Sequence, residues 1–172
     1  PPTQITTLDD YAQRLQRVEA DKSISQTGFV PWLGNGNPTV LWLAANGADV
    51  MDDKQQKWTF NTPTAQKVLT WYQQYVRRYG SNDAVNQFTG QFTGKNTPLG
   101  SGKVAMQIVG DWIPLLEYDK NSPALKYGVG KIPVAQGVPE GTNTVIGSDT
   151  FVLPAKVKHP EESMRFMLYM DS

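Results

Sequence analysis

Three stretches of this chain repeat apolar side chains at the spacing of an amphipathic helix. In residues 7–20 the apolar positions lie three and four residues apart, behind a threonine suited to be an N-cap. A second helix is predicted behind Thr62 and Pro63, which favour a helix N-terminus, and it ends at Gly80. A third is predicted over residues 160–170. The positions expected to face inward are Leu8, Tyr11, Ala12, Leu15, Val18, Val68, Leu69, Tyr72, Tyr75, Val76, Tyr79, Met164, Phe166, Met167 and Leu168.

Shorter apolar runs predict one buried helix and several strands. Residues 39–46 are apolar on nearly all sides and stop at Gly47, as a short buried helix with a glycine C-cap does. Residues 104–109 are rich in β-branched side chains and are bracketed by glycines, which predicts a mostly buried central strand. Further elements are a hairpin at 48–51 and 57–60, a short helix at 112–118, and strands at 28–32, 127–132 and 148–153.

Polar connections separate these elements. Residues 81–98 form a long polar stretch in which Gln-Phe-Thr-Gly occurs twice, and a loop of that length in a compact domain is usually functional or mobile. Residues 34–38 and 136–146 are rich in turn-forming residues and also predict loops. Helices and short strands therefore intermix along the chain. This order predicts an α/β or α+β lobe rather than a helix bundle or a β-sandwich.

The charge balance narrows the classes of partner. The 172 residues carry sixteen basic and sixteen acidic side chains, so the formal net charge is zero, and neither sign forms a long block. Nucleic acids and anionic membranes both need a concentrated positive surface, so neither is expected as the main partner. The chain has no cysteine, and its longest apolar run is far shorter than the roughly 20 residues of a membrane span. We expect residues 1–172 to be a single domain cut from a longer protein.

The end of the predicted central strand carries the best candidate for chemistry. The chain turns at Gly110 and presents Asp111 and Trp112, and ligands of α/β domains usually bind at the carboxyl ends of strands. An aromatic ring offers its face to the C–H face of a sugar, while a carboxylate accepts hydrogen bonds from hydroxyl groups. The structural alternatives are a core tryptophan and an aspartate that caps the next helix. From the residues alone, both alternatives stay open.

Two further loops and one tryptophan are candidate ligand contacts. They comprise Trp32, Asn35, Asn37, Gly147, Ser148 and Asp149. The glycine lets the backbone approach a ligand closely, and the asparagine amides both donate and accept hydrogen bonds. Ordinary turn formation explains the same residues without a ligand.

Catalytic and cofactor patterns are poor in this chain. The single histidine, His159, stands before Pro160 at a predicted helix start, which does not suit a general base. Residues 90–95 superficially resemble a phosphate-binding loop, but their glycine spacing is one residue short. A glycosidase pair of Asp111 and Asp149 is an alternative, because the sequence does not determine their separation. We expect no enzymatic activity, no metal and no cofactor.

Several segments, in order along nearly the whole chain, carry a family resemblance. Residues 99–106, followed by Gly110-Asp111-Trp112, resemble the F-x-x-G-K-x-A-M … G-x-W segment of family 1 extracellular solute-binding proteins, the sugar receptors of ABC importers. Residues 60–63 are similar to the F-N-S-P-E segment of that family, with threonine in place of serine. Further similarities lie at residues 1–3, 45–48, 127–129 and 158–162, whereas residues 146–148 depart from the Gly-Gly of the family.

The resemblance implies the C-terminal lobe of a periplasmic-binding-protein-like (type II) two-lobed α/β fold, with a small mixed sheet flanked by helices. It implies that the protein captures a mono- or oligosaccharide between two lobes and delivers it to the membrane subunits of an ABC permease. The implied partners are the sugar, the missing N-terminal lobe and the permease, with no nucleic acid. The implied location is extracytoplasmic, either periplasmic or lipid-anchored at the bacterial cell surface. The alternatives are a carbohydrate-active enzyme or accessory module, and a receptor of the same fold for a non-sugar solute.

Overall fold

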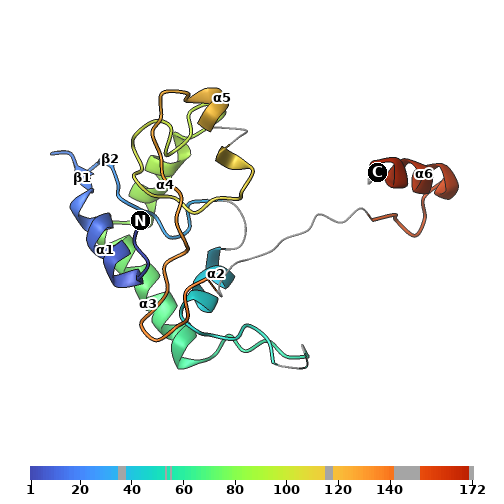
Figure 1. The fold of residues 1–172 in the computed structure, drawn as a ribbon, viewed down its shortest axis with the longest axis horizontal. Coiled ribbons are helices and arrows are strands. Elements are labelled where there is room, and N and C mark those ends of the chain that lie inside the picture. Colours follow the sequence, from blue (N-terminus) through green and yellow to red (C-terminus); the bar gives the residue numbers. More distant parts are fainter. Residues whose placement is uncertain (35–37, 53, 55, 115–117, 142–151, 171–172) are drawn as a thin grey trace.

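The computed structural model describes residues 1–34, 38–52, 54, 56–114, 118–141 and 152–170 (Figure 1). Within them the helices are α1 Ile5–Arg14, α2 Pro38–Ala45, α3 Pro63–Arg78, α4 Asn82–Gly90, α5 Asp119–Asn121 and α6 Pro160–Met170, and the strands are β1 Arg17–Val18 and β2 Ile24–Gln26. None of the helices in the described residues has the length and apolar content that a membrane crossing requires.

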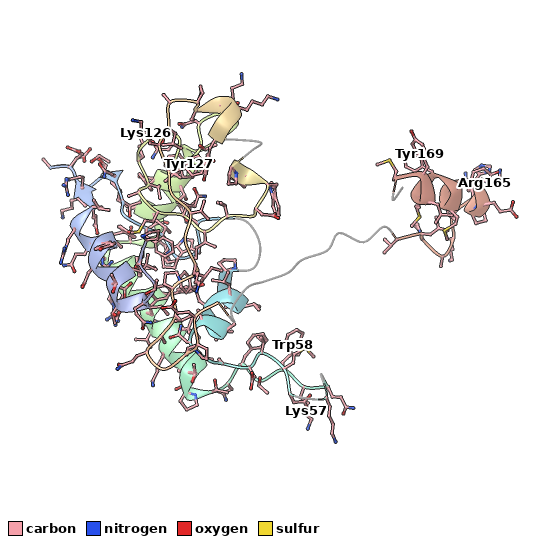
Figure 2. The ribbon with its side chains drawn as sticks, viewed as in Figure 1. Lys57, Trp58, Lys126, Tyr127, Arg165 and Tyr169 are labelled. Carbon is pink, nitrogen blue, oxygen red and sulfur yellow. The ribbon has the colours of Figure 1, made fainter. Side chains whose placement is uncertain are left out.

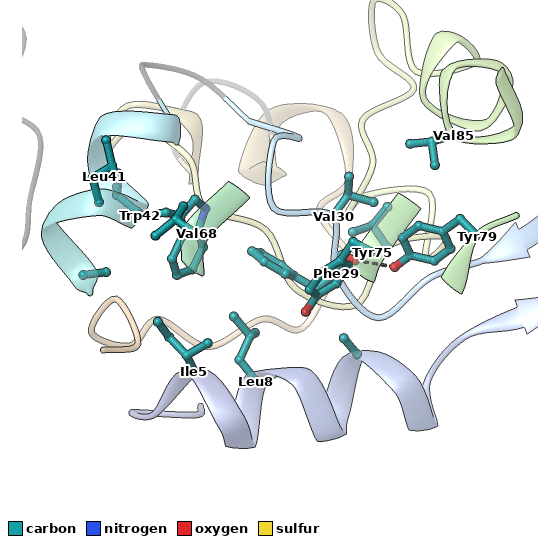
Figure 3. Packing of buried hydrophobic residues seen from close by; sticks show 14 of the residues in the cluster. Ile5, Leu8, Phe29, Val30, Leu41, Trp42, Val68, Tyr75, Tyr79 and Val85 are labelled. Atoms are coloured by element: carbon teal, nitrogen blue, oxygen red, sulfur yellow. Dashed lines mark hydrogen bonds between the residues drawn. The ribbon is translucent and has the colours of Figure 1, made fainter. Parts of the chain in front are cut away.

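The core forms where α1, α2, α3 and α4 meet around Phe29 (Figure 3). The Phe29 ring meets Trp42 of α2 and Tyr75 of α3 edge-on, with ring centroids 5.8 and 6.2 Å apart. The indole N–H of Trp42 is buried and donates to the Pro31 carbonyl at 2.9 Å, so its one polar atom is satisfied. The predicted buried helix at residues 39–46 is therefore confirmed as α2, one residue earlier at each end.

The second predicted helix is confirmed with its caps. The Thr62 hydroxyl accepts a hydrogen bond from the Ala65 amide at 3.1 Å, and Pro63 occupies the first helical position. Gly80, just past the end of α3, has a φ of +93°, which a side chain would disfavour. The prediction that Leu69 faces inward is wrong, because its side chain is exposed.

Helix α1 starts earlier and ends earlier than its apolar pattern predicts. The Ile5 amide donates to the Val134 carbonyl at 2.9 Å, so a contact distant in sequence, rather than a threonine cap, sets the start. At the other end Arg17 and Val18 pair with β2 in an antiparallel ladder, which ends the helix although the helical spacing continues. Leu15 and Val18 are consequently exposed.

Helix α4 lies in the stretch predicted to be a loop. The Ser81 hydroxyl accepts a hydrogen bond from the Ala84 amide at 3.1 Å and caps the helix. Val85 and Phe88 point into the core. The prediction of an irregular segment over residues 81–98 is therefore wrong for its first half, because two apolar residues at helical spacing are enough to bury this face.

The sheet is smaller than predicted. Beyond the two-stranded ladder of β1 and β2, Thr27 forms an isolated parallel bridge with Val104. Around that bridge the Thr27 amide donates to the Lys103 carbonyl at 2.8 Å, the Ala105 amide to Thr27 at 3.1 Å and the Met106 amide to Gly28 at 2.9 Å. We call these backbone hydrogen bonds the 27–104 ladder. The prediction of a mostly buried central strand over residues 104–109 is therefore wrong beyond this isolated bridge, because residues 105–109 form no strand and only Val104 is fully buried.

Of the other predicted strands, some form isolated bridges and some are absent from the described residues. A parallel bridge joins Gln4 to Val134, and an antiparallel bridge joins Met51 to Trp58, which confirms the predicted hairpin. Residues 28–32 and 127–132 contain no strand, and most of 148–153 lies outside the described residues. The predicted mixed sheet flanked by helices is therefore confirmed only in part.

Gly28 allows α1 to pack directly on the 27–104 ladder. A Cβ atom built on Gly28 would lie 2.4 Å from the Cα of Ala12, closer than any real side chain tolerates. Ala12 is fully buried at this contact. The helix and the ladder therefore meet backbone to backbone, which only glycine permits here.

Asp9 links α1 to α3 through side chains. The Trp71 indole N–H donates to its carboxylate at 2.9 Å, and the Tyr75 hydroxyl donates at 2.6 Å. The Arg78 guanidinium lies over the Tyr75 ring, 4.5 Å from its centroid. Burial raises the pKa of Asp9 above its ordinary value, outweighing the two donors and Arg78, which lower the pKa.

We predict that Asp9→Ala lowers the free energy of unfolding by about 2–3 kcal/mol, because it leaves the Trp71 and Tyr75 donors unpaired. Asp9→Asn keeps an acceptor oxygen and is expected to cost less. Since the folded-state pKa of Asp9 is raised above 3.8, the folded state holds this proton more tightly than the unfolded chain. The stability of the wild-type chain relative to Asp9→Asn should therefore fall as the pH rises from 3.8 through that raised pKa. Urea unfolding of both proteins across this range measures the difference, and a rise would contradict the assignment.

Candidate functional site

The chain makes a tight turn over residues 110–113. The Ile113 amide donates to the Gly110 carbonyl at 3.1 Å, and the buried Ile113 side chain anchors the end of the turn. Between them, Asp111 and Trp112 are exposed, with 51% of the Trp112 surface accessible. The indole folds back over Gly110, because a Cβ atom there would lie 2.3–2.6 Å from three of its ring carbons. Trp112 is therefore a surface residue held against the backbone, not a core tryptophan.

Gly34 brings the start of a second candidate loop against the chain that leads into this turn. A Cβ atom on Gly34 would lie 2.1 Å from the carbonyl oxygen of Ile108, so the contact requires glycine. Ile108 stands just before Gly110, and the 27–104 ladder holds the beginning of the same segment on the core. The structure thus places Gly34, the last described residue before the gap at residues 35–37, next to the segment that carries the candidate turn.

Trp32 has a different environment from Trp112. Its half-buried ring meets Tyr72 of α3 edge-on, with centroids 5.7 Å apart and planes at 69°. The Leu33 amide donates to the Val30 carbonyl at 3.1 Å and closes a turn around Trp32. Burial raises the pKa of Tyr72, against a smaller opposing effect of the Thr39 side chain. Trp32 therefore packs against α3, and its role as a ligand contact stays a prediction.

A mostly apolar cavity of about 590 Å³ reaches the candidate turn. Its walls come largely from residues 105–111 and 125–133, and Gly110 and Asp111 lie in its lining, whereas Trp112 does not. The volume lies within the range of small-molecule sites. The exposed Asp111 thus lies at the edge of a hollow that is partly open to solvent, and the neighbouring Trp112 ring is exposed as well.

Five of the predicted site residues lie outside the described part of the chain. They are Asn35, Asn37, Gly147, Ser148 and Asp149. Within the described part of the chain, no group of three or more His, Asp or Glu side chains is arranged to hold a metal ion.

Two residues that shape the site were not singled out for it by sequence reasoning. Gly34 belongs to a Gly-Asn-Gly-Asn stretch that predicts a loop, but its contact with Ile108 joins segments far apart in the sequence. Tyr72 was assigned to the apolar face of its helix, which is correct. Its contact with Trp32 depends on how α3 packs, and no local signal reports that.

A second exposed aromatic surface lies away from the candidate turn. Trp58 and Phe60 stack with ring centroids 5.3 Å apart and planes at 10°, and 66% of the Trp58 surface is exposed. Figure 2 shows Trp58 on the projecting hairpin, well separated from Tyr127, a residue that lines the cavity. Trp58 is thus an exposed tryptophan outside the candidate site, which makes it a matched control for Trp112.

The chain is similar to known proteins along nearly its whole length. Residues 2–172 match the family described as bacterial extracellular solute-binding protein. An uncharacterised ABC transporter extracellular-binding protein of Pyrococcus horikoshii is 27% identical over 179 residues, which cover 98% of this chain and 37% of that relative. The solved structures of CpMnBP1 with mannotriose bound and with mannobiose bound are 29% and 30% identical, with TM-scores of 0.73 and 0.77. They cover 98% of this chain, which spans 43% and 42% of theirs.

We predict that Gly110→Ala displaces the Trp112 indole, because the new methyl group occupies the position of the ring. Acrylamide should then quench the Trp112 contribution to fluorescence more strongly, with Trp112→Phe measured in parallel to isolate that contribution. Gly128→Ala is the control, since a Cβ atom at Gly128 meets nothing within 4 Å. Equal quenching in the two glycine variants would show that the indole does not rest on Gly110.

Proposed function

This chain belongs to the bacterial extracellular solute-binding protein family, and from that premise we propose that its parent protein captures a carbohydrate at the Gly110–Trp112 turn for delivery to an ABC importer. The family consists of binding proteins, so the expectation that the chain is not an enzyme is confirmed, and the glycosidase alternative falls. The likeness to the two CpMnBP1 structures shows that the chain adopts part of the same fold.

The observation that carries the proposal is the pairing of an exposed indole with an exposed carboxylate on one anchored turn. A pyranose ring offers an apolar C–H face and a rim of hydroxyl groups. The Trp112 ring supplies a flat apolar surface for the first, and Asp111 supplies acceptors for the second. The Trp112 indole rests against Gly110, which restricts the conformations of this side chain. The side chain therefore loses less conformational entropy when a sugar stacks on the indole.

The ligand of this proposal is neutral, and mannose oligosaccharides are the first to test. The proposed contact residues include no lysine or arginine, which a receptor for an anion is expected to place in its site. CpMnBP1, at about 30% identity, has mannobiose or mannotriose bound in its solved structures. A non-sugar solute is the alternative that the same experiment addresses.

The proposed mechanism needs the rest of the parent protein. The chain spans about two fifths of the relatives it matches, in line with our expectation that it is the C-terminal lobe of a two-lobed receptor. A sugar that touches both lobes favours the closed form by contacts that exist only there, and the closed form would dock on the permease outside the cytoplasm. No bond is made or broken in this cycle.

We predict that Trp112→Ala in the full-length parent weakens sugar binding at least tenfold, which corresponds to about 1.4 kcal/mol. Calorimetry against mannobiose, mannotriose and other mono- and oligosaccharides measures the loss. Trp58→Ala removes an even more exposed tryptophan on the hairpin and should leave the affinity unchanged. If both variants bind the sugar as the wild type does, the sugar does not stack on Trp112. If no sugar binds the wild-type parent, the carbohydrate assignment fails.

We also predict that the 172-residue chain alone binds the same sugar only weakly, with a dissociation constant of about 1 mM or higher, because it holds one side of the site. Titration followed by NMR chemical-shift changes measures such weak binding. A dissociation constant near 1 μM, about 4 kcal/mol tighter, would refute the two-lobed site.

A further inference from the structure

The cavity beside the candidate turn has two kinds of apolar lining. One part consists of Met106, Ile108 and Ile132, half-buried side chains that pack against the core. Another part consists of Tyr127 and Val129, whose surfaces are 37% and 80% exposed. The first part is held in place by the core, whereas the second part is apolar surface that gains stability when it is covered.

Helix α6 does not cover this lining. The spacing of Met164 and Leu168 predicts that they face inward, but none of the residues of α6 is buried. Figure 1 shows α6 lying apart from the other helices, and the cavity lining contains no residue of α6. The inward-facing prediction for this helix is therefore wrong within the described residues, and α6 leaves the cavity open.

An unmodified sugar does not match the chemistry of the lining. A pyranose ring carries hydroxyl groups on several sides, and each one needs a hydrogen-bond partner once it leaves water. Gln107 of the lining already accepts a hydrogen bond from the Tyr118 hydroxyl at 3.4 Å. Lys131 of the lining lies 3.7 Å from the Glu140 carboxylate, and 64% of its side chain is exposed. The cavity thus offers a ligand mostly apolar surface.

An aromatic ring matches this lining better. Tyr118 and Tyr127 both line the cavity and meet edge-on, with ring centroids 5.5 Å apart and planes at 65°. A further ring can pack edge-on or offset against such a pair, and the thioether of Met106 also contacts rings favourably. An apolar cavity of about 150 Å³ is large enough to hold benzene. The cavity of about 590 Å³ therefore has room for an aryl group.

We propose that the solute captured at the Gly110–Trp112 turn is an aryl glycoside, whose sugar stacks on Trp112 while its aryl group enters the cavity beside Asp111. The proposal rests on the proposed function, because it needs the sugar at the turn. Gly110 and Asp111 belong both to the turn and to the lining, so a substituent on the Asp111 side of the sugar reaches the cavity directly. An acyl ester is the competing substituent, but it fills less of the cavity.

The test compares two glycosides of mannobiose in the full-length parent by calorimetry. The phenyl glycoside should bind at least about tenfold more tightly than the methyl glycoside, because the phenyl ring covers apolar lining that the methyl group does not reach. The methyl glycoside is the matched control, since it blocks the same oxygen atom of the sugar without adding a ring. The measured quantity is the ratio of the two affinities.

Substitutions in the exposed part of the lining locate the aryl group. Val129→Asn should reduce the affinity ratio to within about twofold, whereas Val129→Leu, which stays apolar, should preserve it. Because 80% of the Val129 surface is exposed, neither change should prevent folding. Val18→Asn alters an exposed valine of β1 outside the lining and should leave the ratio unchanged.

Trp112→Ala separates the cavity from the indole as the place of the aryl group. This variant should weaken the binding of both glycosides and keep their ratio, because the sugar and not the aryl group stacks on the indole. A ratio that disappears in Trp112→Ala would show that the phenyl ring stacks on Trp112, which overturns the proposal.

The wild-type measurements distinguish this proposal from the proposed function. Equal affinity for the phenyl and methyl glycosides would overturn the aryl proposal and leave the sugar site intact. Tighter binding of acetylated mannobiose, with no gain from the phenyl group, would assign the cavity to an acyl ester instead. Binding of neither the glycosides nor mannobiose itself would refute the carbohydrate assignment, and the aryl proposal with it.

Discussion

The 27–104 ladder is the contact on which the rest of the structure depends. On one side, Gly28 meets the backbone of Ala12, so the ladder is packed on α1 with no side chain between them. On the other side, the ladder fixes the start of the segment that runs past Ile108 to the Gly110–Trp112 turn. Backbone hydrogen bonds and close packing therefore fix where the segment that leads to the turn begins, which restricts the positions that the turn can take.

Glycine recurs at the contacts that shape the candidate site. Gly28, Gly34 and Gly110 each sit where a Cβ atom would overlap backbone or an aromatic ring. In each case the absence of a side chain lets two pieces of chain approach more closely than ordinary residues allow. The polar and aromatic groups that we assign to the ligand thus depend on neighbours that have no side chain at all.

Local signals in the sequence predicted some elements well. Thr62 and Pro63 indicate the start of α3, and Gly47 indicates the end of α2. These signals are readable from the sequence because a capping residue lies within one turn of the helix end that it stabilises. The end of α1 was not predictable, since Arg17 and Val18 leave the helix to pair with β2. Helix α4 lies in a long polar stretch that predicts a loop, and the N-cap at Ser81 is the local signal that indicates the helix. At the site, the exposed turn was found from its residues, but the contact of Gly34 with Ile108 joins distant segments.

The distribution of the five tryptophans has a spectroscopic consequence. Trp42 and Trp71 lie 4.8 Å apart, and Tyr72 contacts both Trp71 and Trp32, so these aromatic rings form one contiguous cluster. Rings this close exchange excitation energy, so the emission of these tryptophans is coupled, although only Trp42 among them is fully buried. Trp58 adds a solvent-exposed background on the hairpin. A ligand stacked on Trp112 therefore perturbs a minor share of the total emission, and a silent fluorescence titration of this protein carries no information about binding.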